Sequence, residues 1–224
     1  MNSEEVRAQI ESITTLLVEC SLCDEQNFPS VRRSGRHTLI TVPNDPDLAI
    51  ALKSGIDYRE IYRRLEETRS FNFRMLDGAI VQLLYDFIGD DLVGHRLSYF
   101  PSPSLEPFQN EPELYENDEI YAEVLKKNIV PFPIRFDYSS DDEKHIEVNH
   151  PKSHMTLGQY QNCRIPVFSP VTPIVFAKFM LRNFYNTAYC AYESRISIQA
   201  TFFPGCITEN EQGIPHLVLS RDAA

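Results

Sequence analysis

Apolar residues near the start of the chain recur every three or four positions, at Val6, Ile10, Ile13, Leu17 and Cys20. This spacing places them on one stripe of a helix and predicts that the stripe is buried. Ser3 or Asn2 can cap the helix, and Glu4 and Glu5 complement the positive end of its dipole. We therefore expect an N-terminal helical unit within residues 1–30.

Three further segments have a helical pattern. Residues 57–70 and the acidic residues 113–127 both have it, and the second segment is expected to be an exposed helix. Residues 172–192 have a continuous apolar face, with Thr172 as a suitable cap and Pro173 at the first helical position. This last pattern predicts one uninterrupted helix.

The clearest turn signal is Asp77-Gly78, which joins two apolar and aromatic runs. Asp-Gly is typical of a two-residue hairpin turn, because both of its central positions need positive φ. It predicts that Phe71–Leu76 pairs with Ala79–Tyr85. A second turn at residues 89–91 leads to a strand at 95–100, which completes an antiparallel meander.

Other short segments rich in strand-forming residues follow the same reasoning. His37–Val42 is expected to be a strand after a basic loop, and residues 131–139, 163–169 and 195–203 are further strands. The tail at residues 205–224 is expected to be irregular and peripheral. Residues 1–224 are therefore predicted to form a single α+β domain, an antiparallel sheet built from hairpins with helices packed mainly on one face.

The net charge of −11 disfavours non-specific binding of DNA, which a basic surface would serve. Acidic residues are concentrated in residues 1–30 and 103–144, so the rest of the chain is nearly neutral and can face a phosphate. No apolar run approaches the roughly 18 residues that cross a bilayer. The N-terminus lacks a basic segment followed by an apolar block. We expect a soluble, cytoplasmic protein with no membrane partner.

The sequence contains neither of the two common nucleotide-binding glycine motifs, G-x-x-x-x-G-K-[ST] and G-x-G-x-x-G. It also lacks the H-E-x-x-H motif of zinc proteases and the G-x-S-x-G motif of serine hydrolases. No cofactor and no metal are therefore expected.

Polar residues that can carry chemistry are concentrated in one part of the chain: Arg135, Asp137, His145, His150, His154 and Arg164. They lie between predicted strands, and loops held by a rigid scaffold are where sites tend to occur. His95 and Arg96, by contrast, are interpreted as a polar pair on the solvent face of a strand.

The spacing of His150 and His154 also allows a metal site, since two histidines four residues apart can share one helix face. Pro151 argues against that interpretation, because the residue before a proline is disfavoured in a helix. The pair can still converge through a turn, with Asp137 or His145 as a third ligand.

The alternative is cleavage of RNA through its own 2′-hydroxyl without a metal. This reaction needs one base, one acid and a cation for the crowded phosphorane. His150 and His154 suit the first two tasks, because their ordinary pKa lies near neutrality. Arg135 and Arg164 suit the third, since a guanidinium pairs with phosphate oxygens in a bidentate manner. Asp137 is expected to orient a histidine.

At these residues the sequence resembles a known family. The segments HRLSYFPSP, IRFDY, HPKSHMTLGQYQNCRIP and FMLRNFY, in this order, are similar to the bacterial domain-of-unknown-function family 2290. The resemblance covers roughly residues 70–190 and implies no activity. The order R-x-D, His, His-rich loop is also similar to that of small TumE-like toxins, which are suspected ribonucleases but lack the extra N-terminal helices. Both resemblances imply a bacterial host, and the second implies a toxin or phage-defence effector.

The leading hypothesis is thus a metal-independent RNA-cleaving effector of toxin or antiviral-defence type. One alternative is a non-enzymatic interaction subunit, in which the aromatic sheet face or the acidic segment 103–125 docks an antitoxin or an ATPase. The other alternative is a metal-dependent nuclease. Convergence of the polar cluster in one cleft is the observation that favours chemistry.

Overall fold

The computed structural model describes residues 1–43, 56–104, 132–160, 162–195 and 201–219. Its centre is a nine-stranded sheet in which the paired strands run antiparallel. The main path through the sheet is β1-β4-β5-β6-β7-β8-β9; β3 pairs with β5, and β2 with β3. The strands are β1 Cys23–Gln26, β2 Ser30–Ser34, β3 His37–Thr41, β4 Phe73–Met75, β5 Ile80–Ile88, β6 Asp91–Phe100, β7 Ile134–Ser139, β8 Ser153–Leu157 and β9 Ile165–Pro166.

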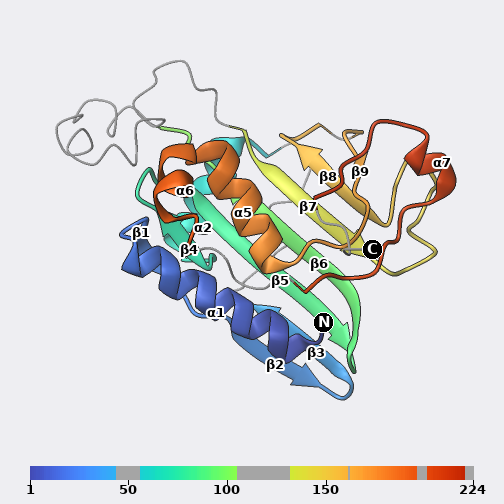
Figure 1. Ribbon diagram of the computed structural model, residues 1–224, viewed down its shortest axis with the longest axis horizontal. Helices are drawn as coiled ribbons and strands as arrows, with labels where there is room; N and C mark the ends of the chain where they lie inside the picture. Colours follow the sequence, from blue (N-terminus) through green and yellow to red (C-terminus); the bar gives the residue numbers. More distant parts are fainter. Residues whose placement is uncertain (44–55, 105–131, 161, 196–200, 220–224) are drawn as a thin grey trace.

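Helices cover mainly one face of this sheet. The described helices are α1 Ser3–Glu19, α2 Tyr58–Glu67, α5 Pro173–Phe184, α6 Asn186–Tyr192 and α7 Glu209–Gln212. Figure 1 shows α1 and α5 lying across the same face, and the main hydrophobic core fills the space between them and the strands. The α+β prediction is confirmed.

The N-terminal helix forms as its sequence predicts. The Asn2 side chain accepts a hydrogen bond from the Glu5 N–H, and the Glu5 carboxylate accepts one from the Asn2 N–H, which makes a capping box. Val6, Ile10 and Leu17 are fully buried. This apolar stripe anchors α1 to the sheet.

The opposite face of the sheet is only partly covered. Side chains alternate between the two faces along a strand, so Ile80 of β5 and Phe100 of β6 point away from α1 and α5. Ile61 and Tyr62 of α2 pack on them in a second, smaller core. The rest of this face, toward β7 and β8, is the part that carries the polar cluster.

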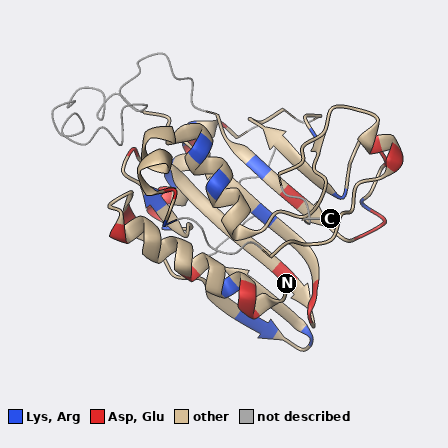
Figure 2. Ribbon diagram, viewed as in Figure 1, with Lys and Arg blue, Asp and Glu red and all other residues tan. Residues whose placement is uncertain are grey.

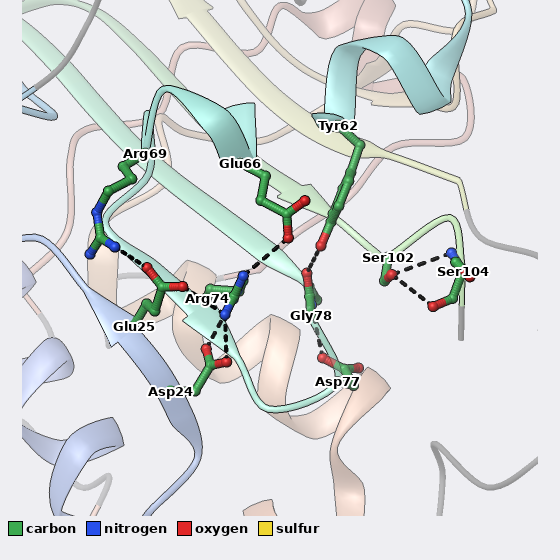
Figure 3. A network of polar contacts seen from close by, with 11 residues as sticks. Asp24, Glu25, Tyr62, Glu66, Arg69, Arg74, Asp77, Gly78, Ser102 and Ser104 are labelled. Carbon is green, nitrogen blue, oxygen red and sulfur yellow. Dashed lines mark hydrogen bonds and ion pairs between the residues drawn. The ribbon is translucent and has the colours of Figure 1, made fainter. Parts of the chain in front are cut away.

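Arg74 of β4 ties this second layer to the sheet edge. Its guanidinium pairs with Asp24 and Glu25 of β1 and with Glu66 of α2, at 2.6–3.0 Å. Figure 3 shows these contacts beside the Tyr62 hydroxyl, which donates to the Gly78 carbonyl at 2.5 Å. The mostly buried Arg74 guanidinium therefore links α2 to the edge strand β1.

The β4–β5 hairpin is confirmed, but its loop has three residues rather than two. Gly78 N–H donates to the Met75 carbonyl at 2.9 Å, and Met75 N–H donates to the Ala79 carbonyl at 2.8 Å. Gly78 has φ 80°, whereas Asp77 is not in the positive-φ region. Asp77 instead caps the turn by accepting the Ala79 N–H. The Asp77 carboxylate therefore stabilises the three-residue loop by pairing with a backbone N–H two residues on.

Three other local predictions were wrong. The expected basic loop before His37 contains β2, an edge strand whose outer residues are exposed. The expected loop around His154 contains β8. The predicted helix over 172–192 is broken at Tyr185, which has φ −136° and ψ 50°. The buried Tyr185 hydroxyl donates to Asp77 at 2.8 Å, and this contact fixes the break.

Two predicted elements lie wholly or partly outside the described residues. The helix expected at 113–127 is one of them. Of the strand expected at 195–203, the described residues 201–203 are not in a strand. The tail beyond Gly205 forms α7, and Leu217 makes a bridge to Val167 next to β9. This segment therefore packs on the edge of the sheet.

Candidate functional site

Two rows of polar side chains cross the partly covered face of the sheet. Arg96 of β6 lies opposite Asp137 of β7, which lies opposite His154 of β8. The next row, two residues along each strand, is Ser98, Arg135 and Thr156. Residues that lie opposite each other on paired strands, or two apart on one strand, point to the same face, so all six side chains share one face of the sheet. Antiparallel register alone thus brings Arg, Asp and His from three strands together.

Five of these residues, all but the fully buried Ser98, form the floor of a cavity of about 890 Å³. All six residues singled out in the sequence line it, namely Arg135, Asp137, His145, His150, His154 and Arg164. The structure therefore brings together side chains that come from β7, β8 and the loops on either side of β8. A cavity of this size suits a small ligand or a segment of a chain.

Asp137 holds two arginines at the centre of the floor. Its Oδ1 pairs with Arg96 Nε at 2.9 Å, and its Oδ2 with Arg135 Nε at 3.2 Å. Burial opposes ionisation of Asp137, but the charges of the two arginines hold its pKa below the ordinary value. Two guanidiniums around one carboxylate leave a net positive charge. Figure 2 shows these charges in the middle of the sheet, on β6 and β7.

His154 is buried and has a defined tautomer. Its Nδ1 lies 2.9 Å from the Pro151 carbonyl, which can only accept, so Nδ1 carries the proton and Nε2 keeps its lone pair. Burial lowers the pKa of His154, although the charge of Asp137 opposes this effect. His154 is therefore a neutral base at pH 7. The Pro151 carbonyl, rather than Asp137, orients this ring, because it takes the hydrogen bond from Nδ1.

His150 lies beside His154, with the two ring centroids 5.2 Å apart. Its backbone pairs with Ile146 in an isolated bridge, and the following Pro151 begins the lead into β8. As expected from that proline, His150 is not helical. Arg164 reaches the same cavity from the loop before β9. The cavity wall thus carries two neighbouring imidazoles and a third arginine.

His145 is held by a residue that the sequence did not single out. Its Nε2 lies 3.1 Å from Glu211 Oε1, and Glu211 of α7 is almost fully buried. The Glu211 carboxylate also accepts the Thr208 N–H at 3.0 Å. The C-terminal segment therefore supplies a carboxylate that orients a histidine, the role that the sequence predicts for Asp137. Nothing in the sequence connects residues 66 positions apart.

His95 and Arg96 are not the solvent-facing pair that we predicted. His95 is buried on the helix-covered face, where its Nε2 accepts the Val171 N–H at 2.9 Å. Arg96 points the other way, into the cavity. Adjacent residues of a strand face opposite sides of a sheet, so the predicted strand at 95–100 already implies that His95 and Arg96 point in opposite directions.

Other features of the described residues bear on the class of site. No group of three or more His, Cys, Asp or Glu side chains gathers there in a way that could hold a metal ion. None of the described helices has the length and apolar character to cross a membrane.

Comparison with known proteins gives one family and no individual relative. A family model described as "Uncharacterized conserved protein (DUF2290)" matches residues 22–219. No curated protein and no solved structure matches the chain. The matched range includes the whole cavity floor and the segment that carries Glu211.

Proposed function

Since the chain belongs to the DUF2290 family, whose description assigns no activity, we propose a function from the site: metal-independent cleavage of single-stranded RNA. One observation carries the proposal. His150 and His154 lie side by side, with ring centroids 5.2 Å apart, in a cavity whose floor holds two arginines around one carboxylate. Phosphodiester cleavage through a 2′-hydroxyl requires this set of a base, an acid and cations.

His154 serves as the base. Its Nε2 carries the lone pair, and its lowered pKa keeps the ring neutral at pH 7. It takes the proton of the 2′-hydroxyl while the 2′-oxygen attacks the adjacent phosphorus. The bond from phosphorus to the 5′-oxygen of the next nucleotide then breaks. The products are a 2′,3′-cyclic phosphate and a 5′-hydroxyl.

His150 serves as the acid that protonates the departing 5′-oxygen. A hydrogen bond spans about 2.8 Å, so two ring nitrogens up to about 5.6 Å apart can contact the same phosphodiester group. The ring centroids of His150 and His154 are 5.2 Å apart, so both rings can present a nitrogen to one phosphodiester group. The two rings are therefore close enough to act on one bond.

The arginines bind the phosphate. Asp137 engages Arg96 and Arg135 through Nε and so fixes the orientation of both guanidiniums. Arg164 adds a positive charge from the cavity wall. Fixed cations in a partly buried site stabilise the charge of the phosphorane without reorganising during the reaction. In the cell, such an activity fits an effector of toxin or defence type that a protein partner restrains.

A cleavage assay in the presence of a chelator tests this proposal. Wild-type protein should cleave single-stranded RNA, and His150→Ala or His154→Ala should each lower the rate by roughly 100-fold or more. His37→Ala is the matched control, because His37 is 56% exposed on β3 and lies outside the cavity lining. It should cleave as the wild type does.

Two other results would replace the proposal. Loss of cleavage in chelator, with recovery on adding a divalent cation, would assign the site to metal chemistry. RNA left intact by the protein, alone and with its genomic neighbours, would favour the interaction-subunit function.

A further inference from the structure

The cavity extends beyond the arginines to an apolar end. Along β7, Arg135 shares the face of Asp137, and Pro133, just before the strand, continues the same alternation. Pro133 and Phe100, the last residue of β6, both line the cavity. Tyr58 and Ile61 of α2 line the cavity here as well. Phe100 and Ile61 are almost fully buried. One cavity thus changes from charged to apolar within a few residues of strand.

An exposed aromatic ring stands at this apolar end. Tyr160, in the loop between β8 and β9, is 75% exposed and lines the cavity. Among the described residues it is the most exposed of the large hydrophobic side chains, and it alone of the exposed ones lines the cavity. Its place beside a polar cavity points to a ligand with a flat face.

The two residues before Tyr160 are anchored by hydrogen bonds. Gly158 N–H donates to the Pro133 carbonyl at 2.7 Å, and Gln159 Nε2 donates to the Ile56 carbonyl at 2.7 Å. Gly158 has φ 59°, and a Cβ there would lie 3.4 Å from the Tyr160 ring. The ring therefore rests against the backbone of its own loop, and the loop joins β7 to the residues before α2.

The distances suit a nucleotide. Two residues of strand advance by roughly 7 Å, so Pro133 lies roughly 7 Å from Arg135 and roughly 13 Å from Asp137. A phosphate at the arginines and the base of the same nucleotide are separated by one sugar, which this span accommodates. A purely apolar ligand at this end would make no ion pair with the arginines of the cavity floor, whereas a nucleotide can contact both ends.

We propose that the apolar end of the cavity, with Tyr160 at its edge, is a nucleobase-binding subsite for single-stranded RNA. Tyr160 stacks on one base while the arginines hold the neighbouring phosphate. Stacking on an aromatic ring accepts every base, because each has a π-face. Asn162, which also lines the cavity, lies in the same loop and can contact the edge of the base. The proposal deepens the ribonuclease function by naming how its substrate is held.

Binding of an uncleavable ligand tests the subsite apart from catalysis. The probe is a 2′-deoxy trinucleotide with 2-aminopurine at the central position, whose fluorescence falls when the base stacks. The chain contains no Trp, so protein emission does not interfere. Tyr160→Ala should weaken binding roughly 10-fold or more and abolish the quenching, while Tyr160→Phe should bind as the wild type does.

Two controls make the result specific. Phe28→Ala removes another exposed ring, 53% exposed and outside the cavity lining, and should leave binding unchanged. A trinucleotide with an abasic central position should bind weakly to wild type, with no further loss in Tyr160→Ala.

The outcomes separate the subsite from the catalytic proposal. Quenching that depends on Tyr160, in a protein that leaves RNA intact, would support the subsite and overturn only the ribonuclease function. Equal binding by wild type and Tyr160→Ala, or no binding by wild type, would overturn the subsite even if RNA is cleaved.

Discussion

Asp137 on β7 lies directly opposite His154 on β8, and both side chains face the cavity rather than α1 and α5. The same register places Arg96 on the other side of Asp137. A basic, an acidic and an imidazole side chain therefore stand in one row across three strands. Because sheet register fixes their spacing, the row is rigid before any substrate arrives, which is what electrostatic catalysis requires.

The pH dependence of RNA cleavage follows from the environment of His154. Burial lowers its pKa below the ordinary 6.5, so the base stays neutral into moderately acidic solution. We expect a bell-shaped profile of kcat/KM whose acid-side midpoint lies below pH 6.5. A midpoint at or above that value would show that His154 is not the base. The profile of His37→Ala should match that of wild type.

Asp137→Asn should destabilise the protein. The change leaves Arg96 and Arg135 close together without their shared carboxylate, and their side chains are only 23% and 19% exposed. Fully buried pairs cost about 3–5 kcal/mol when broken, and partial exposure reduces this to about 2–3 kcal/mol. Urea unfolding at pH 7 measures the loss. Asp142→Asn, which removes a surface pair with Lys152, should change little. Equal stability of the two variants would contradict the role given to Asp137.

The elements that the sequence predicted well are those with strong local signals. The apolar stripe of α1 predicted that helix, which ends where the Cys20 and Leu22 N–H groups bond to carbonyls of its last turn. The Asp77-Gly78 pair predicted the hairpin correctly, although not the length of its loop. Tertiary contacts decided the rest. The residues on both sides of Tyr185 favour one continuous helix, but the helix is interrupted at Tyr185, whose hydroxyl donates to the buried Asp77.

The sequence predicted the residues of the site from their chemical types alone. Their convergence depends on β8, a strand that the sequence did not predict. Ser153–Leu157 alternates in the manner of a strand, but its cavity-facing side is polar, so the hydrophobic pattern that marks a half-buried strand is weak. The link from His145 to Glu211 spans 66 residues and has no local signature. The place of Arg96 does have a local signature, because neighbouring residues of the strand at 95–100 face opposite sides of the sheet.

Replacing Gly78 by Ala should cost about 1 kcal/mol of folding free energy. Gly78 has φ 80°, a conformation that a Cβ disfavours. Urea denaturation measures the change. Gly94→Ala is the control, since Gly94 is outside the positive-φ region and a Cβ there meets only the Tyr138 carbonyl, at 3.4 Å. If both variants are equally stable, the three-residue loop does not require its glycine.

His95 should make folding sensitive to acid. Burial lowers its pKa to about 4 from 6.5, so the unfolded chain binds a proton in this window and the folded chain does not. Stability therefore falls as the pH drops from 6.5 to about 4, by about 3 kcal/mol at this position. In His95→Gln, the difference in unfolding free energy between pH 7 and pH 4.5 should shrink, whereas His37→Gln should retain it. An unchanged pH dependence in His95→Gln would contradict the burial of a neutral ring.

The central claim is that His150 and His154 cleave RNA through its own 2′-hydroxyl. The most direct measurement uses a DNA oligonucleotide with a single ribonucleotide, incubated with the protein in chelator, and identifies the new ends by mass. We predict one cut, on the 3′ side of the ribonucleotide, with a 2′,3′-cyclic phosphate on one product and a 5′-hydroxyl on the other. His154→Ala should slow this cut by roughly 100-fold or more. Cuts at deoxynucleotides, or products with a 5′-phosphate, would contradict the account.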